Sequence, residues 1–189
     1  MGAPRTPAEP PSAEQSAFLE RAMEQYGKAT YNFAYRLTGN EADARDLTQD
    51  AFIRVFRAWR SFQPGTSFLS WIYRIVTNLH RDELRRRKGR FHEEIPEDNA
   101  PQAFGGSRPL AVTPIDDYVE GRLSEPLSKA LAQLSTEQRQ VVVLADIEEY
   151  SYQEIAEIMG CSIGTVRSRL HRARALLRRL VERAQRPTS

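Results

Sequence analysis

Short hydroxyl side chains and cationic groups gather over residues 162–172, and both kinds of group can hydrogen-bond to nucleic acid. On a helix, most of them would lie opposite the apolar positions Val166 and Leu170. Guanidinium groups bind phosphates and guanine edges, and short hydroxyls contact either backbone or bases. The pattern predicts a DNA-contacting helix, and its candidate residues are Ser162, Thr165, Arg167, Ser168, Arg169, His171 and Arg172.

The residues just before this helix predict a partner helix and a tight turn. Ser151 and Glu154 have the spacing of a capping box, Gly160 suits a left-handed helix end, and Ser162 can cap the second helix. The second helix, roughly 18 Å long, fits a major groove about 12 Å wide. A helical hairpin with a solvated arginine face is the alternative. Because the caps, the turn and the polar face agree, the sequence favours a helix-turn-helix.

A second polar stripe is predicted on a helix over residues 68–88. Trp71, Arg74, Asn78, Arg81 and Arg85 recur every three or four residues. Such a stripe could hold single-stranded DNA, because stacking a base on an aromatic ring contributes about 1–3 kcal/mol and arginines follow the backbone. The preceding polar loop, with candidates Gln63, Thr66 and Ser67, could wall a pocket for an extruded base. The alternative is that Trp71 belongs to the core and the arginines form a solvated face.

A third stripe lies on a helix expected to end near Arg60. Its polar members and the apolar residues at its border suggest a protein interface with a basic partner. Packing of Phe52 and Phe56 into the core is the alternative, since aromatic residues at helical spacing usually turn inward. The candidates are Asp46, Gln49, Asp50, Phe52, Ile53 and Phe56.

Composition excludes several classes of protein. Of the 189 residues, 40% are hydrophobic, which suits modest helical cores, and there is a single cysteine, Cys161, so no intramolecular disulfide can form. With three scattered histidines, no metal site is expected, and neither a cofactor nor a set of catalytic residues is predicted. No apolar run suits membrane insertion or a signal core, so a cytoplasmic location is expected.

The helical pattern is interrupted at positions that divide the chain. Residues 1–14 are expected to form a disordered tail, 15–90 a three-helix domain, 91–121 an acidic linker, 122–186 the helix-turn-helix domain and 187–189 a second tail. The sequence thus predicts an all-α protein of two small helical domains joined by a flexible linker. Fully extended, the linker could span roughly 100 Å, so the domains need not touch on a large partner.

Three runs resemble sequences of bacterial sigma factors of the extracytoplasmic-function (ECF) group. They are DLTQDAF at residues 46–52, FLSWIYRIVTN at 68–78 and GTVRSRL at 164–170, and they occur in the order and spacing of that family. The resemblance covers roughly residues 15–90 and 123–180. It implies a first domain of region 2 type, which melts promoters, and a second domain of region 4 type.

The resemblance implies partners for each surface. The third stripe would bind core RNA polymerase at the coiled coil of its largest subunit, and the second domain would meet the polymerase flap. Asn78 and the loop before Trp71 would capture an unstacked non-template base of the minus-ten element. The recognition helix would read the minus-thirty-five element as duplex, and the linker would enter the polymerase cleft. An anti-sigma factor is an expected further partner, and no enzymatic activity is expected.

Two other classes of protein remain as alternatives. A dimeric helix-turn-helix regulator, with residues 15–90 sensing a ligand or forming the dimer, would bind duplex DNA tightly without polymerase. A nucleic-acid-modifying enzyme with a helical catalytic domain would need a clustered acid, base or metal set, which the sequence does not supply.

Overall fold

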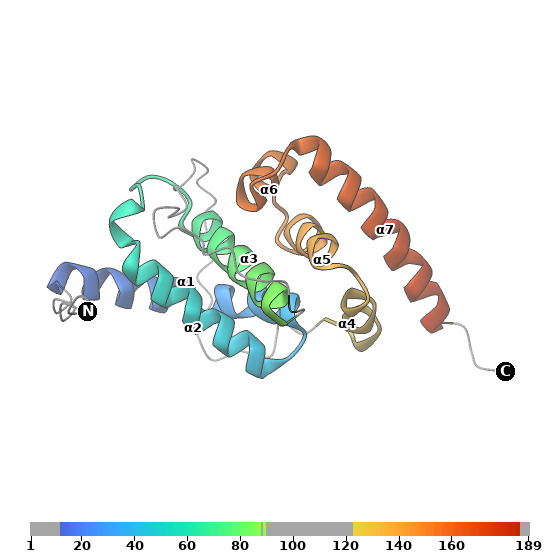
Figure 1. The fold of residues 1–189 in the computed structure, drawn as a ribbon, viewed down its shortest axis with the longest axis horizontal. Helices are drawn as coiled ribbons and strands as arrows, with labels where there is room; N and C mark the ends of the chain where they lie inside the picture. Colours follow the sequence, from blue (N-terminus) through green and yellow to red (C-terminus); the bar gives the residue numbers. More distant parts are fainter. Residues whose placement is uncertain (1–11, 88, 90–122, 186–189) are drawn as a thin grey trace, which may run out of the picture.

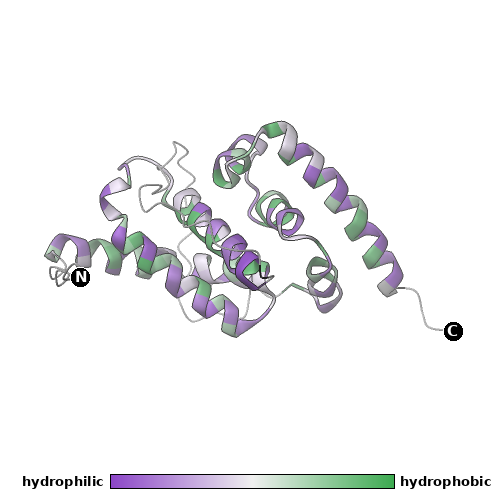
Figure 2. Ribbon diagram, viewed as in Figure 1, coloured by the Kyte–Doolittle hydropathy of each residue, from purple (hydrophilic) through white to green (hydrophobic). Residues whose placement is uncertain are grey.

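The computed structural model describes residues 12–87, 89 and 123–185, and all the regular structure in these ranges is helical (Figure 1). Helices α1 to α3 form one group and helices α4 to α7 form another. Figure 2 shows hydrophilic and hydrophobic residues alternating along the long helices, as amphipathic helices require. The arrangement confirms the expected all-α fold of two small helical domains. The linker expected over 91–121 falls wholly outside the described residues, as do most of the two tails.

Local capping signals set the ends of the helices in the first domain. Helix α1 runs over Ala13–Thr38, where Ser12 Oγ accepts the backbone N–H of Gln15 and Gly39 ends the helix with φ of 80°. Ser12 therefore caps α1, and the helix begins two residues before the expected domain boundary. Helix α2 (Glu41–Arg57), a 3₁₀ turn (Trp59–Ser61) and helix α3 (Phe68–Arg87) follow.

Aromatic side chains fill much of the first core. Phe33 and Tyr73 stack with ring centroids 4.0 Å apart. Near the start of α3, Trp71 packs against Phe62 and Phe68 at centroid distances of 5.4 and 5.6 Å. Trp71 is 0% exposed. The predicted placement of this tryptophan on a stripe opposite the core is therefore wrong, and the alternative that it belongs to the core is correct.

The second domain contains α4 (Glu125–Ala132), α5 (Thr136–Val142), α6 (Tyr152–Met159) and α7 (Ile163–Gln185). The capping box predicted at Ser151 with Glu154 is present, and a second box joins Ser135 with Gln138. Gly160 ends α6 with φ of 60°, as predicted for a left-handed C-cap. These caps fix the turn between α6 and α7, so the helix-turn-helix is confirmed as a fold.

Helix α5 does not end in a regular turn. It continues into a π-helical segment, Val143–Ile147 (η2), in which the N–H of Glu148 donates to the carbonyl of Val143 at 2.9 Å. Glu149 then adopts φ of 55°, the one left-handed residue other than glycine in the described part of the chain. Because Glu148 directly follows this segment, the segment sets the direction in which the Glu148 side chain points. Hydrophobic periodicity gave no sign of it.

The two domains pack against each other, which the sequence did not predict. Helix α3 contacts α6, and α1 contacts both α5 and η2. Glu148 accepts hydrogen bonds from Arg36 of α1 and from the Tyr73 hydroxyl of α3, the latter at 2.9 Å. The Gln140 amide donates to the Thr77 carbonyl at 3.0 Å. Polar contacts therefore join surfaces far apart in the sequence.

Burial of Trp71 leads to a prediction about stability. Trp71→Ala should lower the free energy of unfolding by about 3–5 kcal/mol, because it removes a large side chain from a packed aromatic cluster. Trp71→Phe should cost much less and should preserve helix content. Chemical denaturation followed by circular dichroism measures both. If Trp71→Ala unfolded at the wild-type denaturant concentration, Trp71 would not be a core residue in solution.

Candidate nucleic-acid and polymerase interfaces

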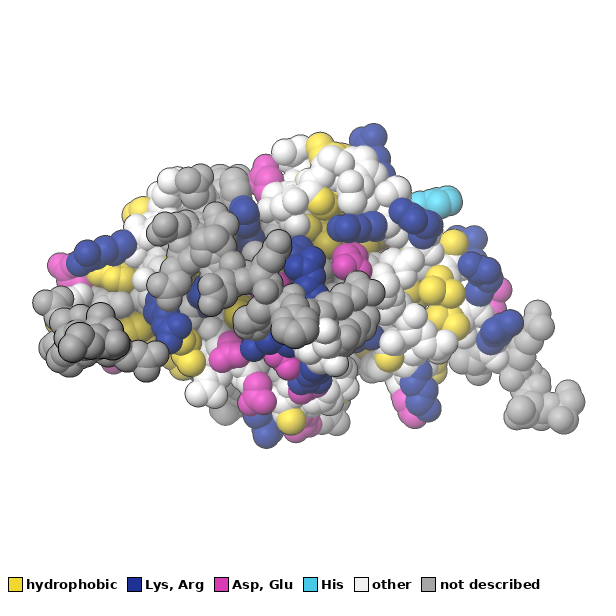
Figure 3. Space-filling view, viewed as in Figure 1, with side chains coloured by type: hydrophobic (Ala, Val, Ile, Leu, Met, Phe, Trp, Pro, Cys, Tyr) yellow, Lys and Arg dark blue, Asp and Glu magenta, His cyan; other side chains and the backbone are white. Residues whose placement is uncertain are grey.

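Helix α7 separates its apolar and polar residues as predicted. Val166, Leu170 and Ala173 are buried, at 0%, 1% and 0% exposure. On the outer side Arg167, Ser168, His171 and Arg172 are exposed, and Thr165 and Arg169 are half-buried. Lysine and arginine side chains gather over α7 in the space-filling view (Figure 3). The helix can therefore present a cationic face without disturbing the core.

Ser162 has a structural duty at the start of this face. Its Oγ accepts the backbone N–H of Thr165 at 3.1 Å and lies 2.9 Å from the Thr165 hydroxyl. The pair caps α7 and fixes the side chain of Thr165. Arg172 Nε donates to the Ser168 carbonyl at 3.2 Å, which holds that guanidinium along the helix.

One cationic position close to this face was missed in the sequence. The Arg174 guanidinium pairs with Asp146 of the π-helical segment, with Nε 3.2 Å from a carboxylate oxygen. The hydrogen bond that Arg174 donates to Asp146 raises the pKa of Arg174. The pair joins residues 28 positions apart, so helical spacing could not reveal it.

On α3, the predicted stripe is reduced to its polar members. Arg74, Asn78 and Arg81 are half-buried and Arg85 is exposed. Arg81 donates to Asn78 Oδ1 at 2.8 Å. Because this bond occupies the amide oxygen, it orients the side chain, and the amide N–H₂ donates to no other described residue. Burial lowers the pKa of Arg74. An oriented amide beside guanidinium groups remains suited to a base and its phosphate.

The loop before α3 is held by its own side chains. Thr66 Oγ1 donates to the Gln63 carbonyl at 2.7 Å, and Ser67 Oγ accepts the N–H of Ser70 at 3.2 Å, so Ser67 caps α3. Gln63 is exposed, whereas Thr66 and Ser67 are half-buried. Trp71 donates its backbone N–H to the Ser67 carbonyl. The buried tryptophan therefore anchors the loop, and in this conformation its ring cannot stack on a base.

The third stripe divides by exposure. Asp46, Gln49, Asp50 and Ile53 are exposed on α2, and Ile53 is 41% exposed. Phe56 is half-buried, whereas Phe52 is 5% exposed and belongs to the core. The expectation that Phe52 lies at an exposed border is thus wrong in this conformation. Two carboxylates, an amide and an exposed isoleucine remain as a surface for a basic partner.

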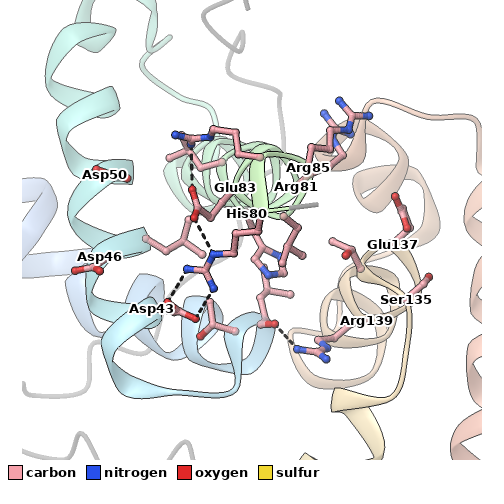
Figure 4. A pocket seen from close by; sticks show the side chains of 18 of the residues that line it. Asp43, Asp46, Asp50, His80, Arg81, Glu83, Arg85, Ser135, Glu137 and Arg139 are labelled. Carbon is pink, nitrogen blue, oxygen red and sulfur yellow. Dashed lines mark hydrogen bonds and ion pairs between the residues drawn. The ribbon is translucent and has the colours of Figure 1, made fainter. Parts of the chain in front are cut away.

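This stripe adjoins a cleft of about 720 Å³ between the two domains (Figure 4). Asp46 and Asp50 line it from α2, and Glu137 and Arg139 line it from α5. Within it Arg87 donates to Asp43 at 2.8 Å, and this hydrogen bond is the main reason that the pKa of Asp43 falls to about 2. The stripe therefore lies at the edge of the domain junction.

Comparison with known proteins covers both domains. Residues 22–90 match the family model for Sigma-70 region 2, and residues 124–177 match the model for Sigma-70, region 4. No helix in the described ranges has the length and apolarity needed to cross a bilayer.

Named relatives agree with the family models. The chain is 45% identical to ECF RNA polymerase sigma factor SigE of Mycolicibacterium smegmatis over 159 residues, which are 84% of the chain and 60% of that relative. It therefore spans about three fifths of that relative's length. It is 34% identical to ECF RNA polymerase sigma factor SigW of Bacillus subtilis over 168 residues, 88% of the chain and 89% of that relative.

Two solved structures resemble the fold. The sigma factor RpoE of Bartonella quintana, in complex with the anti-sigma factor NepR, has a TM-score of 0.63 at 27% identity, covering 88% of this chain and 98% of that one. CnrH in complex with the cytosolic domain of CnrY has a TM-score of 0.59 at 25% identity, covering 90% and 91%. Since both domains match in order and SigW matches over nearly its whole length, the chain belongs to the ECF group of RNA polymerase sigma factors.

Proposed function

We propose that this protein binds core RNA polymerase, directs it to specific promoters and promotes melting of the DNA. The observation that carries the proposal is the oriented Asn78 amide on α3, in the same domain as the exposed acidic stripe of α2. A duplex-binding regulator could use that domain to sense a ligand or form a dimer, but it would need neither of these two surfaces. Family membership supports the same role. The site of action is the cytoplasm, where transcription takes place in bacteria.

The docking surface for polymerase is the exposed part of α2. Asp46 and Asp50 supply charge for a basic partner, and Ile53 supplies apolar area at the centre of the stripe. Gln49 and the half-buried edge of Phe56 complete the surface. We assign it to the coiled coil of the largest polymerase subunit. The second domain is assigned to the flap.

The minus-ten surface is the outer side of α3 with its capped loop. Asn78 would read an unstacked non-template base through its amide N–H₂, and Arg74, Arg81 and Arg85 would follow the phosphates. Gln63, Thr66 and Ser67 would border the base. Melting costs about 1.4 kcal/mol per base-pair step. The binding free energy from capture of unpaired bases offsets that cost without another source of energy.

The minus-thirty-five surface is the polar face of α7. Arg167, Ser168, Arg169, His171 and Arg172 would enter the major groove, while the Ser162 and Thr165 end of the helix approaches a phosphate. No reaction is assigned to the chain itself, and the polymerase performs the chemistry.

We also propose an anti-sigma factor as a physiological partner. The support is the similarity to RpoE, whose structure was solved with the anti-sigma factor NepR, and to CnrH, whose structure was solved with the cytosolic domain of CnrY. The exposed Ile53 and the domain cleft would be natural contact points for it.

Run-off transcription from genomic fragments with bacterial core polymerase tests the proposed function. Discrete start sites that appear only when the protein is added support it. Absence of new starts and of core binding, together with tight duplex binding by the protein alone, would favour the dimeric regulator.

Asn78→Ala should slow open-complex formation by about 10-fold or more, because one base contact of about 1–3 kcal/mol is lost. Core binding should be unchanged. Permanganate footprinting of unpaired thymines measures melting, and native gel shift with core enzyme serves as the control. Wild-type melting rates on every minus-ten variant would remove Asn78 from base capture.

Arg169→Ala should act at the other promoter element. It should reduce discrimination at one upstream base pair by about 1–3 kcal/mol, since direct base contacts carry specificity. Transcription from a library of minus-thirty-five variants measures this, and Arg179→Ala, on an exposed part of α7 farther along the helix, is the matched control. Equal discrimination in the wild type and in Arg169→Ala would contradict the assignment.

Asp50→Lys should weaken binding to core polymerase by 10-fold or more through reversal of charge against a basic surface. Glu20→Lys, an exposed change on α1 outside the stripe, should have a small effect. Fluorescence anisotropy of labelled protein titrated with core enzyme gives both dissociation constants. Similar losses for the two variants would mean that net charge, and not this stripe, governs docking.

A further inference from the structure

Several polar contacts join the two domains, beside apolar packing that includes the ring of Tyr73 against that of Tyr150. Arg36 and Glu148 form an ion pair whose side chains are 17% and 14% exposed, and Tyr73 donates its hydroxyl to the same carboxylate. Arg139 donates to the Leu37 carbonyl at 2.5 Å across the junction. We refer to this set, with Thr77, His80 and Gln140, as the interdomain contact.

The interdomain contact is incompletely satisfied, which is typical of a surface that separates. Thr77 and Gln140 are 0% exposed, yet Thr77 Oγ1 and Gln140 Oε1 have no hydrogen-bond partner among the described residues. The same holds for Nδ1 of His80, which is 6% exposed. Permanent cores pair such groups, whereas interfaces between mobile domains are more polar.

Binding of both promoter elements requires the contact to open, and this step of the argument rests on the proposed function. Elements centred at minus ten and minus thirty-five lie about 25 base pairs apart, roughly 85 Å of duplex. In the structure α3, which carries Asn78, packs directly on α6 of the helix-turn-helix. One closed chain therefore cannot reach both elements, so closure competes with promoter binding.

His80 is the titratable group at the centre of this junction. It projects from α3 into the cleft, where Arg139 lines the other side from α5 (Figure 4). Arg87 of its own helix also lines the cleft, and both guanidinium groups act on the imidazole. The other charged groups lining the cleft are Asp43, Asp46 and Asp50 of α2, Arg81, Glu83, Arg85 and Arg86 of α3, and Glu137 of α5, while α1 contributes Leu37 and Thr38. A proton on the imidazole would add a buried charge between two guanidinium groups.

We propose that the interdomain contact is an autoinhibitory closure of the free chain and that protonation of His80 opens it in mild acid. The closed chain binds a proton at His80 poorly, because the ring is buried and faces Arg139. Separation of the domains exposes the ring and removes Arg139, so the open chain binds the proton more tightly. Acid therefore favours the open form. Once the domains part, α3 and α7 can move to separate promoter elements.

The sign and size follow from the two protonation equilibria. Burial, with Arg139 and Arg87, lowers the pKa of His80 from 6.5 to about 4 in the closed chain. The closed form keeps its full advantage above pH 6.5 and loses it as pH falls toward 4. If opening restores the ordinary pKa, the ratio of closed to open chains falls by about 30-fold between pH 7.5 and pH 5.

The test measures the distance between the domains in the full chain, without polymerase or DNA. Cys161→Ser removes the natural cysteine, and Met23→Cys and Arg179→Cys place a fluorescent donor and acceptor on exposed positions of α1 and α7. Energy transfer should fall reversibly between pH 7.5 and pH 5, and far-ultraviolet circular dichroism should show unchanged helix content. This readout can succeed or fail independently of the proposed function.

Variants separate His80 from general acid effects. His80→Gln should remove the pH response, and His171→Gln, which changes an exposed histidine on α7, should retain it. Glu148→Gln should open the chain at both pH values, because the pair with Arg36 is lost. A constant distance in the wild type, or a wild-type pH response in His80→Gln, would overturn the proposal.

A second measurement covers the case in which His80→Gln does not fold. Titration of the His80 ring by nuclear magnetic resonance should give a pKa below 5 in the wild type and a value nearer 6.5 in Glu148→Gln. The pKa of His80 and the closure of the domains are linked reciprocally: if protonation favours the open chain, opening must raise the pKa of His80. Ordinary titration near 6.5 in the closed wild-type chain would overturn the proposal.

Discussion

Helix α3 must serve several surfaces at once, and the rest of the structure depends on how it divides them. Phe68, Ile72 and Val76 turn toward α1 and α2, where they are 6% exposed or less. Tyr73 and Thr77 face the second domain through Glu148 and Gln140. The remaining outer side carries Arg74, Asn78 and Arg81. At 100° per residue, a helix has room for few such faces, so a change on one side of α3 is felt on the others.

The division explains why sequence periodicity succeeded in part. Apolar spacing identified the core side of α7 through Val166 and Leu170, because burial of a helix in a small domain repeats every three or four residues. Caps identified the helix-turn-helix, since Ser151, Glu154, Gly160 and Ser162 act through bonds over three or four residues. Periodicity placed Trp71 on the wrong side, however. The ring of Trp71 is covered by Phe62, which lies in the loop before α3. Helical spacing within α3 gives no information about contacts with a loop residue.

Contacts between distant residues were beyond the reach of the sequence. The bond between Arg36 and Glu148 spans 112 positions, and the pair of Arg174 with Asp146 depends on where η2 directs its residues. A π-helical turn has no hydrophobic signature, because it inserts one residue into an otherwise regular pattern. Polar residues in such positions look like solvated surface until the fold brings their partners beside them.

The core within each domain and the contact between the domains differ in their chemistry. Within each domain the core is built from aromatic and aliphatic side chains, and its tyrosines do not ionise near neutral pH, so the stability of each core should vary little from pH 5 to pH 8. Between the domains, one carboxylate holds Arg36 and Tyr73, and a neutral imidazole sits among guanidinium groups. These charged groups cost desolvation on both sides of the contact, so a change in their charge can weaken it. The chain can thus change the relation of its domains while each domain keeps the shape of its own binding surface.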